Sequence, residues 1–229
     1  MSIKAIFLDF YGTLVHEDDE IIPLICEKIK AGSNDECEIK DIGSYWWQTF
    51  SRMFQNSYGD SFRTQRNLGI ASLEETIHHF NSEGIAEEMI KMQFDHWMKP
   101  AIYDDTLPFI QKFSQVPLYI LSNIDTSDVI AAAAHHKIKV TDIITSEDVR
   151  SYKPRPELFV EALSRHNLKS SEVIHIGDSI TSDVGGAGKL GIKTIWLNRL
   201  NKQKPEGINP DYICKDLNEA QMILINELG

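Results

Sequence analysis

The stretch FLDFYGTLV, residues 7–15, closes a short apolar run with a carboxylate at Asp9 and then breaks the run at Gly12. An apolar run of this length is typical of a buried strand. Ligands of parallel α/β sheets gather at the carboxyl ends of strands, so Asp9 is a candidate site residue. Two residues later, where a second carboxylate would complete an acid/base pair, the sequence has Tyr11. Any reaction at Asp9 must proceed without an acid at position 11.

Short β-rich runs recur in the outer parts of the chain and alternate with segments of helical character. The runs are residues 5–10, 117–124, 141–146, 173–179, 194–198 and 211–215, and the helical segments include residues 127–138, 155–166 and 182–191. This alternation predicts an α/β fold with a parallel sheet that is covered on both faces.

The interval from His16 to Met98 breaks the alternation. Residues 20–30, 44–54, 72–80 and 86–98 carry apolar residues near helical spacing. An all-helical insertion of this length is too large for a loop. We therefore predict a core domain formed by residues 1–15 and 99–229, and an inserted helical cap domain formed by residues 16–98.

Composition limits the classes of partner. The 229-residue chain has 34 acidic against 23 Lys and Arg residues, a net charge of -11, which disfavours nucleic acid and anionic membrane as partners. An anionic substrate would need local positive charge. Cys26, Cys37 and Cys214 are scattered and follow no metal-ligand spacing, which fits a reduced cytoplasm. Neither a membrane span nor a signal peptide is expected, and the oligomeric state stays open.

Four polar clusters follow the predicted strands, and their order is informative. DFYGT carries Asp9 and Thr13, LSN carries Ser122 and Asn123, YKP carries Lys153, and GDSITSD carries Asp178 and Asp183. These motifs, with a helical insertion after the first, resemble the haloacid dehalogenase superfamily over nearly the whole chain. The resemblance implies a Rossmann-like core, a nucleophilic aspartate after the first strand, and a helical cap that closes over it.

The resemblance also implies a metal. A carboxylate that attacks phosphorus forms an aspartyl-phosphate, and the meeting of two anions requires positive charge between them. Mg²⁺ suits this role because it takes oxygen ligands. By resemblance, the ligands are Asp9, the main-chain carbonyl of Tyr11 and Asp178, with Asp183 ligating directly or orienting a metal-bound water.

The remaining motif residues complete the implied catalytic set. The hydroxyls of Thr13 and Ser122 are expected to bind the non-bridging oxygens of the phosphoryl group. Lys153 adds positive charge on a loop constrained by prolines, and Asn123 accompanies Ser122.

Tyr11 opens an alternative, because haloacid dehalogenases carry DxYGT whereas the phosphatases usually have an aspartate at this position. Three departures oppose it: Asp178 stands in the metal-ligand position, Phe159 replaces a tyrosine, and Trp47 stands where an arginine is expected. We therefore predict a Mg²⁺-dependent phosphatase acting on a small phosphorylated metabolite. The alternatives are a metal-independent 2-haloacid dehalogenase that uses Asp9, and a binding protein that has lost the chemistry of this fold.

Overall fold

The computed structural model describes residues 2–228. It divides into two compact units, Met1–Glu17 with Ala101–Gly229, and Asp18–Pro100. Each boundary lies two residues beyond the predicted one, at 17/18 instead of 15/16 and at 100/101 instead of 98/99. A cap function for the second unit stays a prediction.

The first unit contains a six-stranded sheet in which every neighbouring pair of strands is parallel. The strands are β1 (Ala5–Leu8), β2 (Leu118–Ser122), β3 (Asp142–Thr145), β4 (Val173–Gly177), β5 (Lys193–Leu197) and β6 (Tyr212–Cys214). Their order in the sheet is β3-β2-β1-β4-β5-β6. The predicted α/β class and parallel sheet are confirmed.

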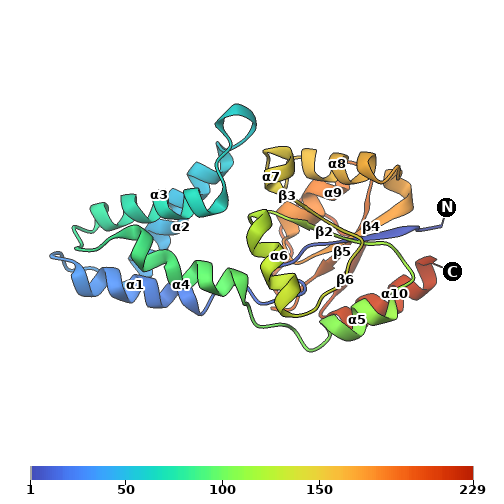
Figure 1. The fold of residues 1–229 in the computed structure, drawn as a ribbon, viewed down its shortest axis with the longest axis horizontal. Helices are drawn as coiled ribbons and strands as arrows, with labels where there is room; N and C mark the ends of the chain where they lie inside the picture. Colours follow the sequence, from blue (N-terminus) through green and yellow to red (C-terminus); the bar gives the residue numbers. More distant parts are fainter. Residues whose placement is uncertain (1, 229) are drawn as a thin grey trace. The chain divides into compact units, whose positions relative to one another are not determined.

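Helices cover both sides of this sheet (Figure 1). They are α5 (Thr106–Lys112), α6 (Thr126–His135), α7 (Ser146–Val149), α8 (Glu157–Arg165), α9 (Gly186–Gly188) and α10 (Leu217–Leu228). In Figure 1, α8 lies on one side of the strands, and α5 and α10 lie on the other. Phe7 and Leu121 of the sheet share a buried apolar cluster with Leu158 and Phe159 of α8, so burial of apolar surface holds α8 on the sheet.

The helix predicted over residues 182–191 is shorter and less regular than expected. Residues Ile180–Gly185 form a π-helical turn, in which the N–H of Val184 donates to the carbonyl of Ser179 at 3.3 Å, and α9 follows with only three residues. Packing favours glycine here, since a Cβ at Gly186 would lie 2.8 Å from the Phe159 ring. Such π-turns are frequent at functional sites.

The strand order has a functional consequence. β1 and β4 are neighbours, yet the connections that leave them run toward opposite edges of the sheet. In open α/β sheets, ligands bind outside the carboxyl ends of the strands at such a switch point. The residues that follow β1 and β4 are therefore the expected ligand-binding residues.

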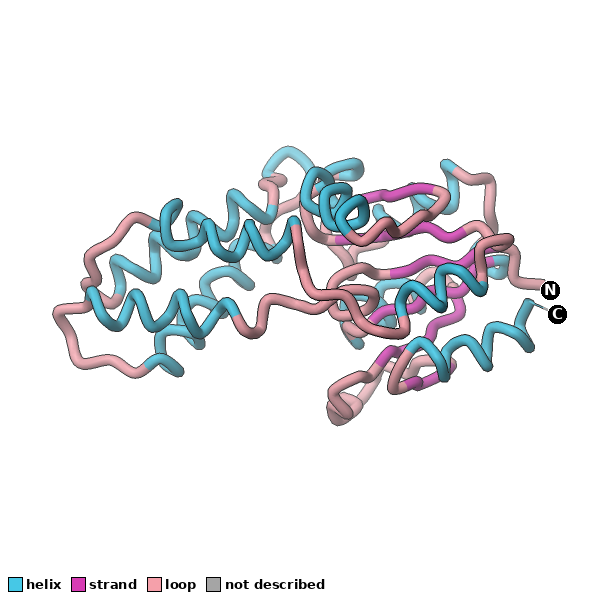
Figure 2. The backbone as a smooth tube through the Cα atoms, turned by 60° about the horizontal axis from the view of Figure 1, so that its bottom comes forward, coloured by secondary structure: helices cyan, strands magenta, loops and turns pink. Residues whose placement is uncertain are grey.

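The second unit consists of helices α1 (Ile21–Gly32), α2 (Ile39–Gln55), α3 (Gln65–His79) and α4 (Ala86–Met98), with a short 3-10 turn at Gly59–Ser61. Figure 2 shows them as cyan coils joined by loops. The carboxylate of Asp18 accepts hydrogen bonds from Gln93 Nε2 at 2.6 Å and Trp97 Nε1 at 2.9 Å, which ties the start of this unit to its last helix. Across residues 2–228, we find no helix with the length and apolar character that a membrane crossing requires.

Candidate active site

The polar residues predicted from the four motifs gather at one edge of the sheet. Asp9 follows β1, Ser122 ends β2 and Asp178 follows β4. Because all the strands are parallel, their carboxyl ends meet at this edge. The arrangement places the chemistry at the β1/β4 switch point of the first unit.

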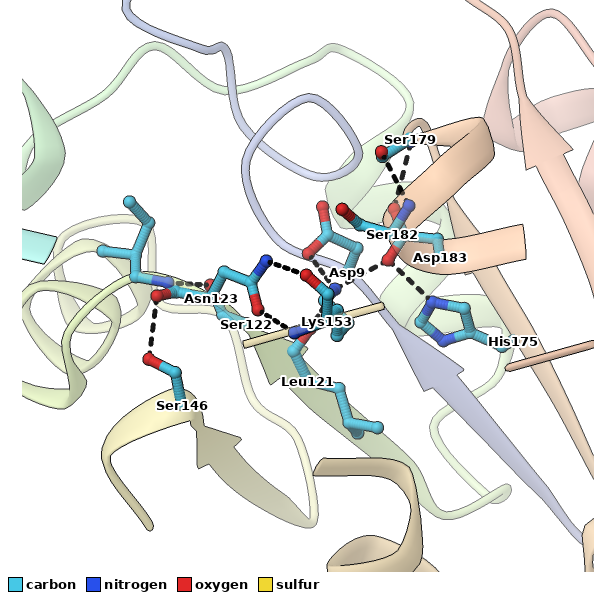
Figure 3. A network of polar contacts seen from close by, with 11 residues as sticks. Asp9, Leu121, Ser122, Asn123, Ser146, Lys153, His175, Ser179, Ser182 and Asp183 are labelled. Atoms are coloured by element: carbon cyan, nitrogen blue, oxygen red, sulfur yellow. Dashed lines mark hydrogen bonds and ion pairs between the residues drawn. The ribbon is translucent and has the colours of Figure 1, made fainter. Parts of the chain in front are cut away.

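Lys153 lies at the centre of this group (Figure 3). Its Nζ donates to Asp9 Oδ1 at 2.7 Å, to Asp183 Oδ1 at 2.6 Å and to the carbonyl of Leu121 at 2.7 Å. The residue is only 1% exposed. A buried ammonium needs such partners for its donors, so the local positive charge expected from the sequence lies beside Asp9.

Asn123 holds the main chain of Lys153. Its Oδ1 accepts from the Lys153 N–H at 2.8 Å, and its Nδ2 donates to the Lys153 carbonyl at 3.2 Å. The Asn123 carbonyl accepts in turn from Ser146 Oγ at 2.9 Å. These contacts, drawn in Figure 3, make Asn123 a residue that positions Lys153.

Asp183 makes hydrogen bonds through both of its carboxylate oxygens. Oδ1 lies 2.9 Å from His175 Nε2 as well as contacting Lys153, and Oδ2 accepts from the Ser179 N–H at 3.0 Å. The sequence reasoning missed both His175 and Ser179. The signal available for His175 was one polar residue inside the otherwise apolar strand VIHIG.

Burial and charge drive the pKa values of the two carboxylates apart. Burial raises the pKa of Asp9 to about 7, despite the opposing effect of Lys153. Burial also acts to raise the pKa of Asp183, but Lys153 and His175 outweigh it and lower this pKa to about 2. Burial lowers the pKa of His175. Divergent pKa values in neighbouring acids are typical of catalytic sites.

Asp178 completes a cluster that can hold a metal. One carboxylate oxygen from each of Asp9, Asp178 and Asp183 lies within 4.8 Å of the others. Burial, followed by the charges of Asp9, Glu17 and Asp183, raises the pKa of Asp178 well above its ordinary value. A cation would relieve this repulsion, and an all-oxygen donor set fits Mg²⁺.

Gly12 allows Asp178 to approach the loop after β1. Its φ of +79° is a conformation that L side chains rarely adopt, and a Cβ there would lie 2.6 Å from Asp178 Oδ1. Glycine is thus favoured at position 12 for two reasons: the backbone has a positive φ, and Asp178 leaves no room for a Cβ.

Three further predicted residues lie in this region. Thr13 is fully buried, and among residues 2–228 its Oγ1 has no hydrogen-bond partner. Ser122 Oγ accepts from the Ile124 N–H at 3.2 Å. Tyr11 is buried, with its ring edge-on to Phe10 at 5.1 Å between centroids. A buried hydroxyl without a partner is costly, which is consistent with a ligand-binding role for Thr13.

Comparison with known proteins matches the chain to one family model and to several individual relatives. A family model described as haloacid dehalogenase-like hydrolase matches residues 3–191. The haloacid dehalogenase-like hydrolase domain-containing protein 3 of Danio rerio is 41% identical over 78 residues, which cover 34% of this chain and 32% of that protein. The pyrimidine 5'-nucleotidase of Escherichia coli is 35% identical over 83 residues, covering 36% and 37%.

A longer match extends over most of the chain. The (S)-2-haloacid dehalogenase 4A of Burkholderia cepacia is 25% identical over 220 residues, covering 92% of this chain and 87% of that protein. The matches to the first two relatives, in contrast, span only 32% and 37% of those proteins. The crystal structure of an L-2-haloacid dehalogenase superposes with a TM-score of 0.82 at 16% identity, covering 98% of this chain and 100% of that one. The structural likeness concerns the fold alone.

Proposed function

The chain belongs to the haloacid dehalogenase-like hydrolases, and we propose that it is a Mg²⁺-dependent phosphatase that acts on a small phosphorylated metabolite through Asp9. The acidic cluster carries this proposal, because Asp178 brings a third carboxylate to within 4.8 Å of Asp9 and Asp183. A bound cation would offset the repulsion that Asp178 experiences from Asp9 and Asp183. The similarity to the pyrimidine 5'-nucleotidase of Escherichia coli supports the same choice.

The proposed reaction takes place at Asp9 in two steps. A carboxylate oxygen of Asp9 attacks phosphorus, and the bond from phosphorus to the leaving oxygen breaks with its electron pair. Water then attacks the aspartyl-phosphate, which releases phosphate and restores Asp9. Lys153 donates to Asp9 Oδ1 at 2.7 Å and offsets its charge during both steps, and the hydroxyls of Thr13 and Ser122 bind phosphoryl oxygens.

The metal would be held by Asp9, Asp178 and the main-chain carbonyl of Tyr11, with Asp183 beside them. When bound, Mg²⁺ neutralises charge on the phosphoryl group. Asp183 also positions Lys153 and the turn after β4, because it accepts hydrogen bonds from Lys153 Nζ at 2.6 Å and from the Ser179 N–H at 3.0 Å.

The second candidate is 2-haloacid dehalogenation, and Tyr11 together with the long dehalogenase match favours it. In that reaction, Asp9 would attack the carbon that bears the halogen, halide would leave, and water would hydrolyse the ester. Asp178 argues against this candidate. So does Phe159, which is fully buried against His175 and offers no hydroxyl.

One experiment separates the candidates. The purified protein is incubated with p-nitrophenyl phosphate, a panel of metabolite phosphates including nucleoside monophosphates, and 2-chloropropionate, each with Mg²⁺ or with excess EDTA. We expect phosphate release only with Mg²⁺. Halide release that persists in EDTA would establish the dehalogenase instead, and turnover of no substrate would favour a binding protein.

Two variants sharpen the assignment. Asp9→Asn should abolish either activity, because the amide cannot act as the nucleophile. Asp178→Asn should abolish only the Mg²⁺-dependent phosphatase and leave a metal-independent dehalogenase active. The pattern across the two variants therefore tests the nucleophile and the metal separately.

A further inference from the structure

Arg199 reaches the site loop from a distant part of the chain. It follows β5, yet its Nη2 donates to the main-chain carbonyl of Thr13 at 2.9 Å, across 186 positions of sequence. Thr13 is the residue whose buried hydroxyl has no partner among the described residues. Arg199 thus contacts the main chain that carries this hydroxyl.

The guanidinium is itself held firmly. Nη1 and Nη2 donate to the two carboxylate oxygens of Asp105 at 3.0 and 2.9 Å, and the guanidinium lies 3.8 Å from the centroid of the Tyr103 ring. Asp105 also accepts from the N–H of Leu217 at 2.8 Å. A bidentate pair combined with ring stacking requires the planar guanidinium, and lysine cannot reproduce it.

The loop that follows β1 is also held at Leu14, the residue after Thr13. The carbonyl of Leu14 accepts from Thr106 Oγ1 at 2.6 Å and from the Tyr103 N–H at 3.3 Å. On the other side, Gly12 adopts a φ of +79°. The Thr13 carbonyl lies between Gly12, whose N–H donates to the Val15 carbonyl at 2.7 Å, and the Leu14 anchor. The peptide that follows Thr13 is held at both of its polar groups, because the Leu14 N–H donates to the Phe10 carbonyl at 2.8 Å and the Thr13 carbonyl accepts from Arg199 at 2.9 Å.

We propose that Arg199 is a positioning residue, which fixes the Thr13 main chain and so directs the Thr13 hydroxyl toward the phosphoryl group. The inference rests on the proposed function for the role of Thr13. It assigns a role in the reaction to a residue that touches neither Asp9 nor the acidic cluster. Misplacement of a catalytic group by about 1 Å can cost about 10²-fold in rate.

A double-mutant cycle tests whether Arg199 acts through Thr13. Hydrolysis of p-nitrophenyl phosphate with Mg²⁺ is measured for the wild type, Arg199→Lys, Thr13→Val and the double variant. We expect Arg199→Lys to lower kcat/KM by about 10- to 100-fold when Thr13 is present. In the Thr13→Val background, where there is no hydroxyl to orient, the loss should be less than about threefold. Equal losses in both backgrounds would show that Arg199 acts independently of Thr13.

Arg165→Lys is the matched control. Arg165 also pairs with several carboxylates, Asp142, Asp148 and Glu161, but it lies on α8 and is bonded to no residue of the site. We expect it to leave kcat/KM unchanged, because among the described residues Arg165 pairs only with Asp142, Asp148 and Glu161, outside the site.

Amide hydrogen exchange gives a readout that does not depend on turnover. Arg199→Lys should accelerate exchange in the peptide that covers residues 10–15 by about tenfold, as expected when local opening becomes easier, and Arg165→Lys should not. If Arg199→Lys does not fold, the Asp105→Asn variant is measured in its place, because it weakens the same bidentate pair between Asp105 and Arg199. Absence of Mg²⁺-dependent phosphate release from every phosphate ester of the panel would refute the proposed function, whereas unchanged exchange in residues 10–15 would refute the role of Arg199.

Discussion

At the scale of single residues, Tyr11 sets an expectation for substrate preference. A positioned general acid contributes about 10²–10⁴-fold, and the phenol of a tyrosine, which is a much weaker acid than a carboxylic acid, replaces it poorly at neutral pH. We expect kcat/KM to fall steeply as the pKa of the leaving group rises, from aryl and acyl phosphates to alkyl phosphates. Tyr11→Asp should flatten this dependence. A series of phosphate esters measures it, and a flat series for the wild type would show that another acid acts.

The buried hydroxyl of Thr13 is expected to lower the stability of the fold while it supports activity. Its Oγ1 is buried without a partner within the described part of the chain, and such a group costs about 1–3 kcal/mol. Thr13→Val should therefore leave Tm unchanged or raise it, while kcat/KM falls by at least about tenfold, a loss of the size found for single transition-state donors.

Thr106→Val is the control for Thr13→Val. Thr106 is equally buried, but its hydroxyl donates to the Leu14 carbonyl at 2.6 Å. Its removal should cost about 1 kcal/mol of stability. A comparable fall in Tm for both variants would contradict the assignment of a ligand-facing hydroxyl to Thr13.

Asp9 should make the stability of the metal-free protein depend on pH. Its pKa rises from 3.8 to about 7 on folding, so the folded state binds more protons between these values. Stability from this group is then present at low pH and is lost as pH rises through about 7. In EDTA, Asp9→Asn should match the wild-type Tm below about pH 4, where Asp9 is protonated in both the folded and the unfolded state, and should exceed it by a margin that grows up to about pH 7. A gap in Tm that is constant with pH would contradict this expectation.

At the scale of elements, the end of β4 packs closely against Asp183. A Cβ at Gly177 would lie 2.2 Å from Asp183 Cγ, closer than real Cβ atoms approach. Gly177→Ala should therefore displace Asp183, lower stability by about 1–3 kcal/mol and reduce turnover. Urea unfolding and kcat/KM measure both effects.

Gly188→Ala, in α9, is the matched control for Gly177→Ala. Nothing lies within 4 Å of a Cβ built at Gly188, and alanine is favoured over glycine in a helix by about 1 kcal/mol. Stability should be unchanged or higher. Equal destabilisation by the two substitutions would show that contact with Asp183 is not the cause.

At the scale of the whole molecule, Mg²⁺ should stabilise the folded chain. A ligand at 100 times its Kd adds about 2.7 kcal/mol if it binds only the folded state, which raises Tm by roughly 5–10 °C for a chain of this size. Asp178→Asn should remove most of this rise, and Asp142→Asn, at the edge strand β3, should retain it. A Tm that does not respond to Mg²⁺ in the wild type would contradict the proposed metal site.

The sequence by itself determined the class of the fold and the place of the chemistry. Six apolar runs separated by helical segments predict a parallel sheet, because periodicity and turn residues are local properties of the chain. Asp9, Lys153 and Asp178 could be selected because they follow such runs within ordered motifs. The structure brings them to one edge of the sheet, as parallel strands require.

Only the tertiary structure decided how these groups are supported. His175 contacts Asp183 across a turn, Asn123 holds the main chain of Lys153, and Arg199 reaches Thr13 across 186 positions. Such pairs leave no periodic signal in the sequence, because their partners become neighbours only when strands and loops pack. The irregular turn Ile180–Gly185 has the same origin, since hydrogen bonds at Ser179 and the close packing of Gly186 on Phe159 override the local preference for a regular helix.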